Sequence, residues 1–278
     1  MSQDLAMGFN WYLASRQVDK ANFKISNISK ENTMNRLIPI LVLFLTGYGL
    51  HAQQNKVPEG FISLFNGTDL TNWKVPEGDN GHWKVIDGVI DYDAESEAPG
   101  EKHLWSEKSY KDFVLYVDWR IKETPWQNPR VPLILPSGLH KRDEKGKEIT
   151  MIVPDSDSGI LMRGPGKCQA NIWCWPIGSG EVYGYRMDEK MPADVRRGVT
   201  PVTNADRNIG EWNTFKITFK GDRLTVELNG LVVIENAWLP EIAASGPIGL
   251  QHHGSKRDGE WVSPPSLVQF RNIYIKEL

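Results

Sequence analysis

Two amides and two indoles alternate along one short segment of the chain. Within residues 169–175, the odd positions hold Gln169, Asn171, Trp173 and Trp175, while the even positions are small and apolar. In a β-strand the odd and even sets lie on opposite faces. Amides hydrogen-bond hydroxyl groups, and indoles pack on the apolar faces of pyranose rings. We therefore expect a carbohydrate-binding cleft, the alternative being that these tryptophans cover a loop or a dimer contact.

A carboxylate follows this segment closely. Glu181 comes just after the glycine turn 178–180, and Tyr183 lies two residues further on. We take Glu181 as the candidate general acid or base, and Tyr183 as a candidate contact to the substrate.

Basic side chains come from two other segments. Arg163 ends an apolar run, and its guanidinium could bind a hydroxyl, carbonyl or carboxylate. A surface ion pair is the alternative. Positions 248 and 250 are apolar, so Gln251 and His253 should point away from the core. Histidine suits proton transfer near neutral pH, which makes His253 a catalytic candidate and His252 a further substrate contact.

Metal binding has weak support. Residues 155–159 are similar to part of a calcium loop but lack the later glutamate ligand. We expect no cofactor, with Ca²⁺ as the one cation that the motif suggests. Cys168 and Cys174 lie six residues apart on a predicted strand, about 20 Å at ~3.3 Å per residue, so no disulfide should join them.

Period-two alternation predicts the elements that position these residues. It is strongest over 113–121, 215–220 and 224–229, and the dipeptides at 87–88, 221–222 and 229–230 predict tight hairpin turns. Shorter strands are expected at 61–65, 160–163, 170–175, 248–252 and 268–276, with one short helix at 192–197. Many short strands without alternating helices predict an all-β sandwich or jelly roll of antiparallel sheets.

Residues 34–52 carry a basic start, a short apolar run and a polar end, which is the pattern of a secretory signal peptide. We expect residues 1–33 to be an upstream extension and 57–278 to form one domain, periplasmic or extracellular and without stable membrane insertion. The alternative is a buried helix over 38–45. Within the domain, the proline-rich segment 124–157 is expected to be a long loop with an exposed tip that leans over the cleft.

Composition excludes one class of partner and favours another. The net charge is −3 and the pI about 6.1, which gives no basic surface for nucleic acid. Eleven tryptophans in 278 residues favour a sugar site. The oligomeric state stays open.

Short motifs then point to a family. They lie at 61–70 with Trp73, 83–90, 112–113, 158–163, 210–213, 229–230, 246–254 and 270–275. In this order they resemble the 3-keto-disaccharide hydrolase family. The resemblance implies a concanavalin-like jelly-roll sandwich, an exported protein, and action on glycosides whose sugar carries a ketone at C3. It also implies that Trp212, Asn213 and Asn272 are scaffold residues.

The sequence departs from the family in two places. Many members carry Glu-x-Gln where this chain has Gln169-Ala170-Asn171, and the segment 124–157 is longer than usual. Our hypothesis is that His253 or Glu181 removes the C2 proton while Arg163 stabilises the enolate. Elimination at C1 and hydration would follow. The alternatives are a glycosidase with two carboxylates, a carbohydrate-binding module, and an interaction domain with a flat tryptophan face.

Overall fold

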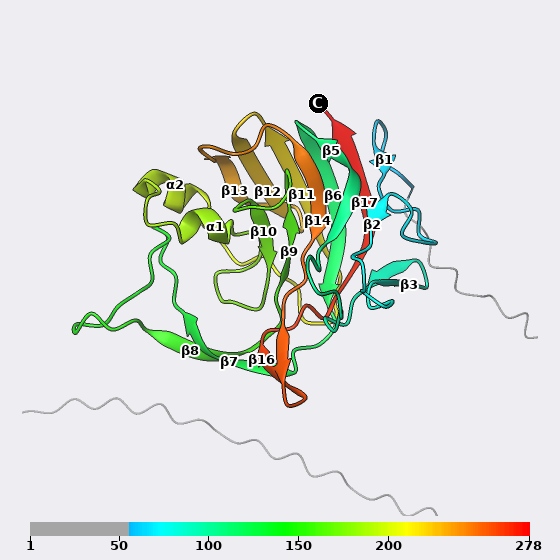
Figure 1. Cartoon of the computed structure of the whole chain (residues 1–278). Coiled ribbons are helices and arrows are strands. Elements are labelled where there is room, and N and C mark those ends of the chain that lie inside the picture. Colours follow the sequence, from blue (N-terminus) through cyan, green and yellow to red (C-terminus); the bar gives the residue numbers. More distant parts are fainter. Residues whose placement is uncertain (1–55) are drawn as a thin grey trace, which may run out of the picture. The chain divides into compact units, whose positions relative to one another are not determined.

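The computed structural model describes residues 56–278, which build two antiparallel β-sheets packed face to face (Figure 1). The expected extension 1–33 and signal peptide 34–52 lie outside the described residues. An all-β sandwich is therefore confirmed. Within residues 56–278, neither helix has the length or the apolar character to cross a bilayer.

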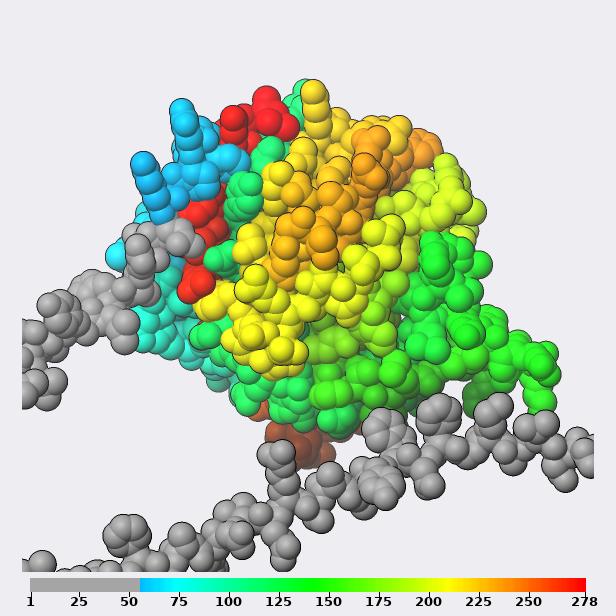
Figure 2. All heavy atoms as spheres, turned by 180° about the vertical axis from the view of Figure 1, so that it is seen from behind, coloured from blue at the N-terminus to red at the C-terminus, as the bar shows by residue number. Residues whose placement is uncertain are grey.

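The larger sheet has eight strands. Their spatial order is β13 (Leu231–Trp238), β12 (Arg223–Leu228), β11 (Asn213–Lys220), β6 (Phe113–Ile121), β17 (Val268–Glu277), β4 (Val89–Asp91) and β3 (Lys84–Ile86), and β1 (Ile62–Ser63) pairs with β17. From behind, strands β11 to β13 show as a yellow and orange surface, with red β17 near blue β1 (Figure 2).

The smaller sheet lies against it, with strand order β10 (Gln169–Ile172), β9 (Ser158–Leu161), β14 (Gly246–Leu250), β5 (Leu104–Tyr110) and β2 (Trp73–Lys74). Two separate ribbons are formed by β7 (Trp126–Pro132) with β8 (Thr150–Asp155), and by β15 (Ser255–Arg257) with β16 (Glu260–Ser263). The helices are α1 (Tyr183–Arg186), which the sequence did not predict, and α2 (Ala193–Gly198), which matches the helix expected at 192–197.

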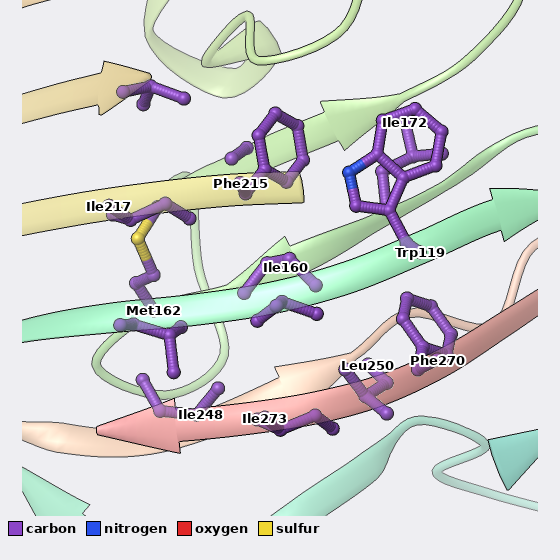
Figure 3. Close-up of a cluster of buried hydrophobic side chains, with 14 of the residues drawn as sticks. Trp119, Ile160, Met162, Ile172, Phe215, Ile217, Ile248, Leu250, Phe270 and Ile273 are labelled. Atoms are coloured by element: carbon purple, nitrogen blue, oxygen red, sulfur yellow. The ribbon is translucent and has the colours of Figure 1, made fainter. Parts of the chain in front are cut away.

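Alternating apolar residues form the core between the sheets. On β6 and β11 nearly every second side chain is fully buried, including Trp119 and Phe215, whose rings lie 5.3 Å apart. They meet Ile160 and Ile172 from the smaller sheet (Figure 3). The predicted hairpins are confirmed. At one of them, Asn229 and Gly230 adopt the positive φ values, 53° and 83°, that such a tight turn requires.

The segment 124–157 is a β-ribbon rather than an irregular loop. Strands β7 and β8 pair only with each other among the described strands, and the register shifts between Asn128 and Val131. A two-stranded ribbon has open edges, which is where a strand accommodates proline. Pro129 and Pro154 therefore fit within it. The ribbon projects from the sandwich (Figure 1).

Arg163 has a structural role, which corrects the expectation that it meets the substrate. Its backbone leaves β9 with φ of 59°, so the strand alternation no longer sets the direction of the side chain. The guanidinium is buried and lies 3.8 Å from the ring centroid of Phe219. It donates hydrogen bonds to the carbonyls of Lys111, Gly221 and Ala243 and to the carboxylate of Asp112. Arg163 thus ties three chain segments together.

Replacing Arg163 should therefore destabilise the fold. We expect Arg163→Met to lower the free energy of unfolding by about 2–4 kcal/mol, because it removes a buried charged group that donates to three carbonyls and to Asp112. Arg223→Met on β12 is the control, since Arg223 is half exposed beside Asp222, and it should change stability by less than ~0.5 kcal/mol. If urea unfolding shows that both substitutions change the free energy of unfolding by the same small amount, this role is contradicted.

Candidate active site

An open cleft of about 400 Å³ lies where the end of the smaller sheet meets α1 and the ribbon. It brings together seven residues singled out from the sequence, namely Gln169, Asn171, Trp173, Trp175, Tyr183, Gln251 and His253. The other lining residues are Asn128, Asp157, Gly166, Lys167, Gly184 and Pro264. The alternation along and just after β10 and after β14 predicted the face of six of these side chains, whereas Tyr183 reaches the cleft from α1.

Three amides form a connected cluster in the cleft. The side-chain nitrogen of Gln169 donates to Oδ1 of Asn171 at 2.6 Å and to Oε1 of Gln251 at 2.7 Å. These bonds leave the NH₂ groups of Asn171 and Gln251 as donors for a ligand. Gln169 crosses the neighbouring strand at Gly159, where a Cβ would come within 2.5 Å of its amide nitrogen. The glycine is therefore required by the close approach of Gln169.

The two tryptophans stack on each other instead of forming two separate platforms. Their ring centroids are 4.1 Å apart and their planes differ by 5°. Trp173 is only 3% exposed, and its Nε1 donates to the carbonyl of Gly178. Trp175 is partly exposed, so it offers the indole surface, while Trp173 supports it from behind. Tyr183, at the start of α1, meets Trp173 edge-on at 6.2 Å.

Asp155 at the end of β8 fixes the position of Trp175. Its Oδ2 accepts hydrogen bonds from Nε1 of Trp175 at 3.0 Å and from Nδ2 of Asn128 at 2.8 Å. Asp155 is fully buried, and burial raises the pKa of its carboxyl group. One carboxylate thereby joins both strands of the ribbon to the indole in the cleft.

Asp157 is the carboxylate that faces the cleft, and sequence reasoning treated it only as part of a weak calcium motif. Burial raises the pKa of Asp157 to about 7, the charge of His253 opposes this shift, and Asp155 adds to it. The strand alternation could have predicted that Asp157 faces the cleft. Ile160 is in the core, so Gly159 and Asp157 follow the opposite parity, which is the face that carries Gln169 on the paired strand.

His253 is held in a defined orientation. Its Nδ1 lies 2.6 Å from the carbonyl of Pro264, so this nitrogen carries the proton and donates it. In the neutral ring, Nε2 is then the basic nitrogen. The backbone N–H of His253 donates to the hydroxyl of Ser266, which fixes the segment after β14.

His252 points to the other side, which corrects its expected contact with the substrate. Its Nδ1 lies 2.7 Å from the hydroxyl of Tyr92, outside the cleft. Burial lowers the pKa of His252 to about 4, with a further contribution from the charge of Lys102. Successive residues of an extended segment face opposite ways, so His252 and His253 could not both enter the cleft.

Glu181 is not available as a catalytic acid or base, which is a third correction. Its backbone pairs with Asn171 beside β10, and its carboxylate is fully buried in an ion pair with Arg186 of α1. Burial raises the pKa of Glu181 to about 7, and the charge of Arg186 opposes the shift. Glu181 does not line the cleft. The ion pair with Arg186 holds the carboxylate away from the cleft.

Among residues 56–278, no group of three or more His, Cys, Asp or Glu side chains is arranged to hold a metal ion. Within the same part of the chain, Cys168 and Cys174 are free thiols, as the spacing predicted.

A solved structure shows the same fold. A structure from Parabacteroides distasonis named "putative glycosyl hydrolase" shares 23% identity with this chain, covers 80% of it and 85% of its own length, and superimposes with a TM-score of 0.50. A second structure of that name from the same organism shares 19% identity over 81% of this chain and all of its own, with a TM-score of 0.49.

No curated protein matches the sequence. Residues 60–276 match the model of one family, the 3-keto-alpha-glucoside-1,2-lyase-like domain. That match covers most of the chain and includes every residue that lines the cleft. The chain therefore belongs to the family of 3-keto-alpha-glucoside-1,2-lyase-like domains.

Proposed function

We propose that the protein cleaves glycosides whose sugar carries a ketone at C3, by elimination across C1 and C2 followed by hydration. Family membership supports a carbohydrate-active enzyme. The observation that carries the proposal is a carboxylate with a pKa of about 7, Asp157, in the same cleft as His253 and the amide donors of Asn171 and Gln251. We also retain the proposal that the domain acts after export, on the basis of residues 34–52.

The first step is removal of the proton at C2, which the ketone at C3 makes acidic. Asp157 accepts this proton, since a pKa near the working pH suits a general base. The electron pair of the C2–H bond moves toward C3 and places negative charge on the ketone oxygen. The NH₂ groups of Asn171 and Gln251 stabilise that charge as preorganised donors. They take the role that the sequence had suggested for Arg163.

The second step breaks the bond between C1 and the leaving oxygen. The enolate electrons form the C1–C2 double bond, and the leaving oxygen takes a proton from Nε2 of protonated His253. Water then adds to the unsaturated ketone, its hydroxyl to C1 and a proton from Asp157 to C2, while the second proton of the water returns to His253. The net reaction is hydrolysis, and both side chains recover their starting charge.

Direct hydrolysis by two carboxylates has less support. It requires a pair of carboxyl groups on either side of the glycosidic bond. Among the described residues that line the cleft, Asp157 is the one carboxylate, because Glu181 is buried against Arg186. The sequence resemblance implies a family glutamate at the position of Gln169, and we propose that Asp157 supplies the carboxylate in this chain.

The function can be tested by incubating the purified protein with a 3-keto-glucoside and, separately, with its unoxidised parent in D₂O. We expect release of the aglycone from the keto compound alone, with deuterium at C2 of the product because the proton held by Asp157 exchanges with D₂O before the hydration step returns it to C2. Release from both compounds without deuterium would favour a two-carboxylate glycosidase. Release from neither, with tryptophan fluorescence still quenched by sugar, would indicate a binding module.

Asp157 should control the pH dependence of the rate. Only the deprotonated carboxylate accepts a proton, so on the acidic limb of the profile kcat/KM should rise with pH through about 7. Asp157→Asn should reduce kcat by at least ~100-fold, whereas Asp258→Asn on the exposed β15–β16 turn should have no effect.

The pH dependence of the melting temperature distinguishes loss of catalysis from loss of folding in the Asp157→Asn variant. Folding raises the pKa of Asp157, so the stability that its protonated form provides is lost as pH rises from about 4 through about 7. Asp157→Asn should thus melt higher than the wild type at pH 8, while the two should differ little near pH 4. An inactive variant that melts lower at pH 8 would point to misfolding instead.

The approach of Gln169 to Gly159 gives a further prediction. Gly159→Ala places a methyl group against the Gln169 side chain, which must leave its bonds to Asn171 and Gln251. We expect kcat/KM to fall about tenfold or more with far-ultraviolet circular dichroism unchanged. Gly100→Ala is the matched control, because no atom lies within 4 Å of the added methyl group. Equal activity of the two variants would show that the amide cluster is not part of the site.

A further inference from the structure

A second pocket, of about 370 Å³, shares two residues with the cleft. Trp173 and Trp175 line both spaces. Other lining residues are Val153 and Pro154 of the ribbon strand β8, Trp119 and Ile121 of β6, Cys174, Asn204, Asn213 and the segment 206–209, which precedes β11. The stacked indoles therefore separate two adjoining pockets.

The lining of the second pocket suits a sugar ring. Its apolar surfaces are Trp175, the ribbon residue Pro154 and the half-exposed Ile209. The exposed side chains of Arg207 and Asn208 face the same pocket, and within residues 56–278 neither makes a side-chain hydrogen bond or ion pair. An aromatic surface beside uncommitted amide and guanidinium donors can pack on a pyranose and bind its hydroxyl groups.

The floor of the second pocket holds unpaired polar atoms. Trp119 is 1% exposed, and its Nε1 has no hydrogen-bond partner among the described residues. Oδ1 of Asp206 is also buried without a partner in this part of the chain, while its Oδ2 accepts from the backbone of Ser179. Buried polar atoms are nearly always paired. Both residues line the second pocket, and their unpaired atoms lie behind its surface.

The shared wall is rigid. Asp155 holds the Trp175 indole and Asn128 of the cleft with one oxygen atom, and it directly follows Val153 and Pro154 in β8. A ligand in the second pocket would thus contact the same fixed indole that borders the cleft. The two pockets therefore adjoin at Trp175, whose other face is covered by Trp173.

We propose that the second pocket is the subsite for the leaving sugar, with Arg207 and Asn208 as its specificity-determining residues. This inference rests on the proposed function for the direction of the reaction: the keto sugar occupies the cleft beside Asp157, and the ring that departs from C1 occupies the second pocket. The protein then prefers two-ring substrates to glycosides with a small aglycone.

The test compares wild type with the double variant Arg207→Ala/Asn208→Ala on two 3-keto-glucosides, one with a methyl aglycone and one with a second glucose ring. The expected result is an about tenfold fall in the ratio of kcat/KM for the two-ring over the methyl substrate, since two ligand hydrogen bonds are removed. Arg257→Ala, an exposed arginine on β15, is the matched control and should leave the ratio unchanged. An unchanged ratio in the double variant would overturn the proposal.

Calorimetric binding of an unoxidised glucose disaccharide and of methyl glucoside distinguishes failure of the subsite from failure of the proposed function. If the wild type cleaves neither keto compound, weaker disaccharide binding by the double variant, with methyl glucoside binding altered less, still supports the second pocket as a sugar site. Equal disaccharide binding by wild type and double variant, or no disaccharide binding by either, would reject it.

Discussion

The two faces of the smaller sheet impose opposite demands on the same strands. Along β9 and β10, one set of alternate residues, including Ile160 and Ile172, is buried against the larger sheet, and the other set carries Gln169 and Asn171 into the cleft. Because the side-chain period is two, a slip of one residue would bury the amides and expose the core residues. Burial of the apolar face therefore fixes the register, and the register places the site. The geometry of the cleft depends on the packing behind it.

Strand alternation explains why much of the cleft could be predicted. The seven predicted residues that reach it lie on β10, just after β10 and β14, or at the start of α1. Hairpins were equally accessible, because Asn229-Gly230 specifies its own turn through local backbone preferences. Strand faces and hairpin turns depend on a few neighbouring residues. They can therefore be predicted from a short segment of sequence without knowledge of the remaining chain.

The residues that were predicted wrongly depend on contacts that strand alternation does not indicate. Arg163 leaves the strand in a left-handed conformation and binds carbonyls up to 80 residues away. Glu181 is held in a buried ion pair by Arg186 of α1, a helix that the sequence did not predict. Asp157 was overlooked for a different reason: its parity was readable, but the neighbouring Asp155 suggested a metal motif. In the structure, the Asp155 side chain binds Asn128 of the ribbon, whereas Asp157 lines the cleft.

The ribbon of β7 and β8 has a consequence for the behaviour of the protein in concentrated solution. Its outer edges carry no further strand among the described residues, so they could pair with an edge of another molecule. Pro129, Pro132 and Pro154 have no backbone N–H and interrupt the donor rows that such pairing needs. These prolines are the ones that predicted a loop for this segment. In the folded protein they allow the ribbon to extend beside the cleft while they hinder pairing with strands of other molecules.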